Sequence, residues 1–132
     1  MITIIVIASL LTISLWVPYF LAWVPSKGAK YLLGGNPKQD LTTQVPAWAE
    51  RLQQAHQNAV ENLAAFIGVC AAAQLAGDPA ASALQLGWAY ILARLVHYFS
   101  YGLGIPVVRT VAFMTAWFAT FGIGLLTLNQ LM

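Results

Sequence analysis

Four long apolar stretches occupy most of this 132-residue chain. A helix needs about 20 largely apolar residues to cross a bilayer. Soluble domains carry about 25% charged residues, whereas this chain carries 8%, against 60% hydrophobic residues. We therefore expect an all-α integral membrane protein with a single domain, residues 1–132, that crosses the bilayer four times. The expected helices cover residues 2–24, 47–76, 80–101 and 107–131.

Short connections between the last three helices predict how the helices are arranged. Only residues 77–79 separate the second helix from the third, and only residues 102–106 separate the third from the fourth. Connections this short force antiparallel neighbours, so we expect an up-down four-helix bundle. The one long connection, 25–46, is polar and follows a helix whose last turn Pro18 is expected to kink.

The positive charges predict the orientation in the membrane. Those around the first connection are Lys27, Lys30, Lys38 and Arg51. Arg109 follows the third connection, whereas the opposite side carries only Asp78 and the two termini. By the positive-inside rule, the first and third connections lie in the cytoplasm and both termini lie outside. Residues 1–23 lack a basic leader and a small-residue cleavage site, which favours a retained helix over a cleaved signal peptide.

The second helix has too few apolar residues to cross the bilayer on its own. Its largely apolar part, 63–76, spans roughly 21 Å at about 1.5 Å per residue, against a hydrocarbon core of about 30 Å. Polar residues must therefore lie at membrane depth and face protein or water. Arg51, Gln54, Asn58 and Glu61 are spaced so that all four share one helix face.

The third helix carries a second polar face. Arg94, His97 and Tyr101 follow one another at helical spacing. Arg94 lies about two turns inside the helix end, so its charge needs a partner, and Glu61 is the expected one. Arg109 begins the fourth helix at the same end of the bundle.

These polar residues predict one cluster at one membrane depth. The cluster fits either an ion-pair network that locks helices or subunits together, or a site for a polar ligand. No metal site is expected, because His56 and His97 have no cysteine or carboxylate at ligand spacing. The net charge of +2 is too small and scattered to indicate nucleic acid as a partner.

Three segments, 50–62, 93–101 and 106–110, resemble motifs of the MAPEG family, the membrane-associated proteins of eicosanoid and glutathione metabolism. The helix order and the long first connection agree with that family, and the resemblance, which is to bacterial-type members, covers nearly the whole chain. It implies a homotrimer in a bacterial inner membrane, in contact with membrane lipids. It also implies that glutathione is held between neighbouring subunits near the cytoplasmic face.

The resemblance further implies roles for the clustered residues. Arg109 is the expected catalytic residue, because a nearby guanidinium lowers the pKa of a thiol from about 8.5 and raises its reactive thiolate fraction. Thr110 stands beside it. The expected glutathione-binding residues are Arg51, Asn58, Glu61, Arg94, His97, Tyr101 and Thr110.

The chain departs from the glutathione-using eicosanoid synthases at Gln54 and Gln57, where those enzymes have arginines. One of these arginines contacts a peptide carboxylate, and a charge-assisted hydrogen bond is roughly twice as strong as a neutral one. Lys27 or Arg51 are the candidates to compensate.

Two functions stay open on the sequence alone. The first is a glutathione-dependent transferase or peroxidase that acts on lipophilic electrophiles. The second is a non-enzymatic lipid-binding or structural membrane protein, whose polar faces serve trimer assembly. A channel or transporter is less well supported, because the sequence shows neither an internal repeat nor a pair of discontinuous helices.

Overall fold

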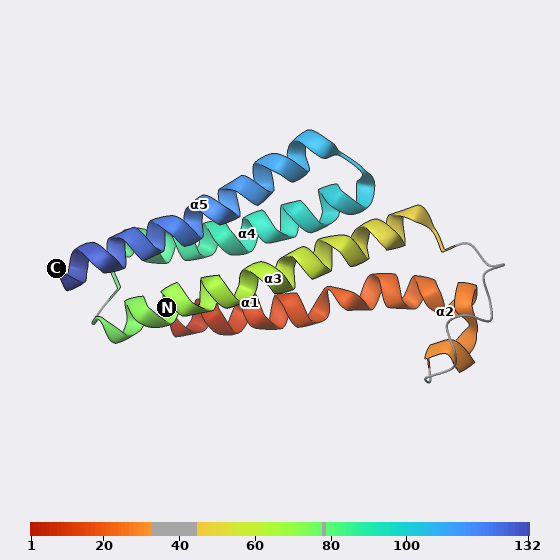
Figure 1. The fold of residues 1–132 in the computed structure, drawn as a ribbon, viewed down its shortest axis with the longest axis horizontal. Coiled ribbons are helices and arrows are strands. Elements are labelled where there is room, and N and C mark those ends of the chain that lie inside the picture. Colours follow the sequence, from red (N-terminus) through yellow and green to blue (C-terminus); the bar gives the residue numbers. More distant parts are fainter. Residues whose placement is uncertain (33–44, 78) are drawn as a thin grey trace.

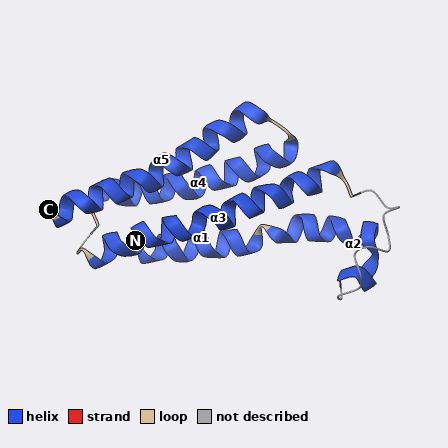
Figure 2. Ribbon diagram, viewed as in Figure 1, coloured by secondary structure: helices blue, strands red, loops and turns tan. Residues whose placement is uncertain are grey.

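The computed structural model describes residues 1–32, 45–77 and 79–132, which form helices and no strands (Figures 1 and 2). The helical segments are α1 (Ile2–Ser14), α2 (Trp16–Leu32), α3 (Ala47–Leu75), α4 (Ala81–Leu103) and α5 (Pro106–Leu131). Because α1 and α2 are two parts of one broken helix, the predicted all-α four-helix bundle is confirmed. Asp78, Lys38 and the side chains of 26–32 lie outside what is described.

Within the described ranges, three helical stretches are long and apolar enough to cross a membrane, namely Ile2–Pro25, α3 and α5. The fourth, α4, is not among them, and it carries Arg94 and His97 within its length. It nevertheless runs antiparallel along α5 and returns the chain to the opposite end of the bundle (Figure 1). The chain is therefore an integral membrane protein, in which α4 depends on its neighbours for shelter from lipid.

The first helix breaks earlier than the sequence predicts. A kink is expected in its last turn, near Pro18, but the break lies at Leu15, and helical backbone then continues past residue 24 to Leu32. Proline has no N–H for the carbonyl four residues before it, and its ring clashes with that carbonyl. The disturbance therefore falls one turn upstream. Tyr98 donates its hydroxyl to the Leu15 carbonyl at 2.8 Å, which ties the break to α4.

The core of the bundle combines a few large rings with many small residues. Phe66 and Tyr90, both fully buried, stack with ring centroids 3.6 Å apart, which joins α3 to α4. At Gly87, an added Cβ would lie 2.8 Å from the Ile4 side chain, so glycine permits the close approach of α1 and α4. Such close van der Waals packing is the main source of helix association in lipid.

A glycine-containing turn positions the start of α5 against the end of α4. Gly104 adopts a left-handed conformation with φ +73°. Its N–H donates to the Tyr101 carbonyl at 3.0 Å, and the Ile105 N–H donates to the Ser100 carbonyl at 2.9 Å. This pair of hydrogen bonds is the Schellman motif that closes many helices. Pro106 then begins α5 at the helix position where its missing N–H costs nothing.

Arg51 of α3 bonds to a residue at this turn. Its Nε donates to the Gly102 carbonyl at 2.9 Å, at the C-terminal end of α4. A cation at that end also interacts favourably with the helix dipole. Arg51 therefore links the start of α3 to the α4–α5 turn.

Replacing Gly104 with alanine should destabilise the protein by about 1–2 kcal/mol, because a Cβ disfavours the left-handed conformation. The matched control is Gly124→Ala, where the new Cβ would lie 3.6 Å from Val69 in ordinary contact. Thermal unfolding in detergent should show a lower midpoint for the first variant only. An equal decrease of the unfolding midpoint in both variants would contradict the role of Gly104 in the turn.

Candidate functional site

Hydrogen bonds between α3 and α4 join the two predicted polar faces. The Arg94 Nη1 donates to Asn58 Oδ1 at 2.9 Å, and the Tyr101 hydroxyl donates to Gln54 Oε1 at 3.0 Å. Both bonds connect residues that lie at membrane depth or near the cytoplasmic end in the predicted orientation. Residues that were predicted to share a polar face on each helix therefore do bond to the other helix.

The expected ion pair between Arg94 and Glu61 is not formed. Arg94 is 3% exposed and bonds to Asn58, which lies one turn before Glu61 on α3. Glu61 is exposed, and its Oε1 accepts a hydrogen bond from Gln57 at 3.5 Å. Because Glu61 points away from α4, the neutral Asn58 is the residue that the buried guanidinium reaches.

Aromatic rings surround the arginines of the cluster. The Arg94 Cζ lies 5.1 Å from the centroid of the Tyr90 ring and 5.7 Å from that of Phe113. The Arg109 Cζ lies 4.6 Å from the centroid of the Tyr101 ring. All three distances fall within the range of cation–π interactions. The first turn of α5 thus contacts α4 through Arg109.

His97 contacts both the ring that lies next to Arg109 and one of the rings that lie next to Arg94. It is 4% exposed, and its ring centroid lies 5.6 Å from Tyr101 and 6.1 Å from Phe113. Both neighbouring rings also contact an arginine. The structure therefore gathers one continuous cluster from α3, α4 and α5. Its predicted members are Asn58, Arg94, His97, Tyr101 and Arg109.

Other predicted site residues have different surroundings. The Thr110 hydroxyl is exposed and donates to the Pro106 carbonyl of its own helix at 2.9 Å. Arg51 closes the end of α4 through Gly102. Glu61 is exposed beside the cluster and has no contact with either of its arginines among the described side chains.

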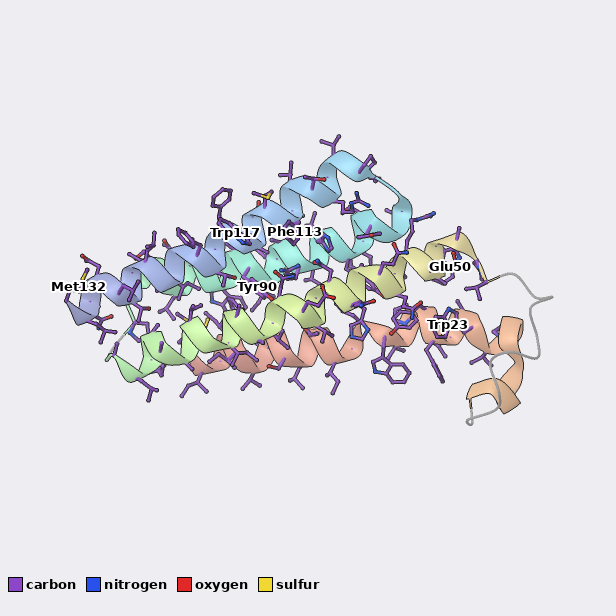
Figure 3. The ribbon with its side chains drawn as sticks, viewed as in Figure 1. Trp23, Glu50, Tyr90, Phe113, Trp117 and Met132 are labelled. Atoms are coloured by element: carbon purple, nitrogen blue, oxygen red, sulfur yellow. The ribbon has the colours of Figure 1, made fainter. Side chains whose placement is uncertain are left out.

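Sequence reasoning missed the part played by Phe113. Figure 3 shows it in the middle part of the bundle, as it does Tyr90. Phe113 lies four residues after Arg109 on α5, so the two side chains share a helix face. That spacing is visible in the sequence and could have included Phe113 in the cluster.

The cluster has an excess of positive charge. It contains Arg94 and Arg109, and no carboxylate within the described part of the chain bonds to either. Arg109 also lies in the first turn of α5, where the helix dipole favours negative charge. The arrangement can therefore hold an anion or stabilise a thiolate.

An apolar groove begins next to the cluster. It lies between α3 and α5, has a volume of about 290 Å³, and has Asn62 and Thr120 among its few polar residues. Trp117 and Phe121 are stacked rings on its α5 side. Asn62 lies one turn after Asn58 in α3 and donates its amide N–H to the Asn58 carbonyl at 2.8 Å, so the polar end of the groove adjoins the polar face of α3.

Comparison with known protein families assigns the chain. The family model described as "MAPEG family" matches residues 3–129, nearly the whole chain. No curated protein and no solved structure shows significant similarity. The matched range includes almost all of the helical bundle and every residue of the cluster. The chain therefore belongs to the MAPEG family.

Proposed function

We propose that the protein is a glutathione-dependent transferase or peroxidase that acts on lipophilic electrophiles. The MAPEG family includes such enzymes. The observation that carries the proposal is that Arg94 and Arg109 lie in one cluster and that no carboxylate of the described residues bonds to either. A site with uncompensated guanidinium groups favours an anionic ligand.

Glutathione matches the charges that this site leaves unpaired. It carries carboxylates, an ammonium group and a thiol. In our proposal, Arg94 and Asn58 bind a carboxylate, and the exposed Glu61 binds the ammonium group. Tyr101 and His97 line the same pocket, and Arg51 and Thr110 lie at its border. The failure of Glu61 and Arg94 to neutralise each other supports this assignment, because each charge stays available to the ligand.

Arg109 is the proposed catalytic residue. Its guanidinium, placed beside the thiol of bound glutathione, would favour the thiolate and lower the thiol pKa. The thiol proton passes to water, and the thiolate sulfur forms a bond to the electrophilic carbon. The electron pair of that carbon's π bond, or of its bond to a leaving group, moves onto the electrophile's own acceptor atom, which is then protonated by water. The helix dipole at the start of α5 stabilises the thiolate further.

The groove between α3 and α5 supports a lipophilic second substrate. Its lining is almost entirely apolar, and both helices are among those apolar enough to cross the membrane. An apolar molecule could therefore enter from the bilayer and reach the polar end of the groove at Asn62. In the predicted orientation, with both termini outside the inner membrane, this end lies toward the cytoplasm.

A homotrimer is part of the proposal. Gln57 and Glu61 are exposed on α3, and polar groups at membrane depth need shelter from lipid. A neighbouring subunit would supply that shelter and would form the other wall of the glutathione site.

A non-enzymatic role in lipid binding or membrane structure is the second candidate. The observation that favours it concerns Gln54, whose amide oxygen already accepts a hydrogen bond from Tyr101. This residue replaces a family arginine and is engaged within the protein. A carboxylate of glutathione would therefore lack one charged partner.

Replacing Arg109 with alanine should reduce glutathione conjugation by about 10²–10³-fold, the scale of losing one group that stabilises developing negative charge. Arg109→Lys should retain more activity because it keeps the positive charge. Gln53→Ala, at an exposed position outside the cluster, serves as the control. Conjugation assays across a panel of electrophiles measure the effect. A wild-type protein with no conjugation and no glutathione binding by calorimetry would refute the enzyme proposal.

Replacing Glu61 with glutamine separates the two candidates. If Glu61 binds the ligand, the oligomer should stay intact and glutathione affinity should fall by about tenfold or more, because a hydrogen bond to a charged group is lost. If the polar face serves assembly, the oligomer should dissociate. Native mass spectrometry in detergent reports the subunit number, and calorimetry reports the affinity.

A further inference from the structure

Arg94 is a buried cation that bonds to no carboxylate among the residues that the structure describes. It is 3% exposed and lies about 14 Å from the Leu103 end of α4. Its Nη1 donates to the neutral Asn58, and its Nε has no hydrogen-bond partner. A buried charge without an opposite charge costs free energy, and removing one partner of a buried ion pair usually destabilises a protein strongly. Something other than a carboxylate must therefore hold the guanidinium.

Two aromatic rings take the position that a carboxylate would otherwise occupy. Tyr90 of α4 and Phe113 of α5 have ring centroids 5.1 Å and 5.7 Å from the Arg94 Cζ. Aromatic rings attract cations at such distances, and the attraction grows when the pair is desolvated. Phe66 stacks on the Tyr90 ring with an interplanar angle of 7°, which fixes the orientation of that ring.

Within the described part of the chain, the hydroxyl of Tyr90 makes no hydrogen bond of good geometry, although the residue is 2% exposed, and Arg94 is the charged group nearest to it in effect. A buried hydroxyl without a hydrogen bond is unfavourable, so the hydroxyl does not account for the presence of a tyrosine at this position. The contacts of Tyr90 are instead made by the ring, with Phe66 and with Arg94.

We propose that Tyr90 and Phe113 form an aromatic cradle that positions the Arg94 guanidinium in place of a counter-ion. They are positioning residues, since they act through Arg94. A carboxylate would hold the guanidinium but would also neutralise it. A ring attracts the cation through its quadrupole and leaves the net charge unchanged. The cradle therefore fixes Arg94 and leaves its positive charge uncompensated within the cluster.

The first test is a double-mutant cycle on thermal unfolding of the ligand-free protein in detergent. In the wild-type background, Tyr90→Leu should lower the unfolding midpoint by several degrees. In the Arg94→Met background, the same change should lower the midpoint clearly less, because the cation that the ring attracts is absent. Tyr98→Leu is the matched control. Tyr98 is the same residue type on the same helix, equally buried at 2% exposed, and it bonds to Leu15 on α1's side of the bundle. Its effect should be the same in both backgrounds.

The second variant keeps the ring and removes the hydroxyl. Tyr90→Phe should leave the unfolding midpoint unchanged or higher, since it removes an unbonded buried group. An equal loss in Tyr90→Phe and Tyr90→Leu would overturn the proposal, because the hydroxyl would then be the essential group. Additive effects of the changes at 90 and 94 would also overturn it. If Tyr90→Leu does not fold, the same double-mutant cycle is measured with Phe113→Leu and Arg94→Met. Additive effects in that cycle would overturn the proposal.

The part of this inference that concerns the ligand rests on the proposed function. Glutathione affinity, measured by calorimetry, should fall on the order of tenfold in Phe113→Leu and should stay near the wild-type value in Tyr90→Phe. If the wild-type protein does not bind glutathione, the proposed function fails, while the unfolding cycle still tests the cradle. If glutathione binds but the cycle is additive, the cradle fails and the proposed function stands.

Discussion

A polar group inside a bilayer finds no water, and every other feature of this bundle follows from that constraint. Two polar residues of α3 are satisfied by α4, through the bonds from Arg94 to Asn58 and from Tyr101 to Gln54. The dependence is mutual, because α4 is the helix that is not apolar enough to count as a membrane span on its own. The two helices thus make each other compatible with the membrane.

The same constraint explains how positive charge is accommodated. Arg51 lies at the end of α4 and bonds to the Gly102 carbonyl. Arg94 and Arg109 contact aromatic rings instead of carboxylates. In each case the guanidinium is held by a neutral partner and keeps its charge.

The sequence predicts the helices and the residues that share a face, because helical periodicity and apolar length are properties of each segment alone. It does not predict which residue meets Arg94. That depends on the rotation of α3 against α4, which brings Asn58 inward and leaves Glu61 outside. The contact between Phe113 and Arg94 depends on packing of the same kind, although the four-residue spacing from Arg109 to Phe113 is visible in the sequence. The break at Leu15 escaped prediction because the effect of Pro18 falls on the preceding turn.

The length of α3 has a consequence for where reactants can meet. With 29 residues it extends about 44 Å, well beyond a hydrocarbon core of about 30 Å. Part of its polar first half must therefore extend beyond the hydrocarbon core, while the groove that starts at Asn62 lies along its apolar half. The boundary between the two phases falls along a single helix. A water-soluble compound and an oil-soluble one could thus meet there without either leaving the phase in which it dissolves.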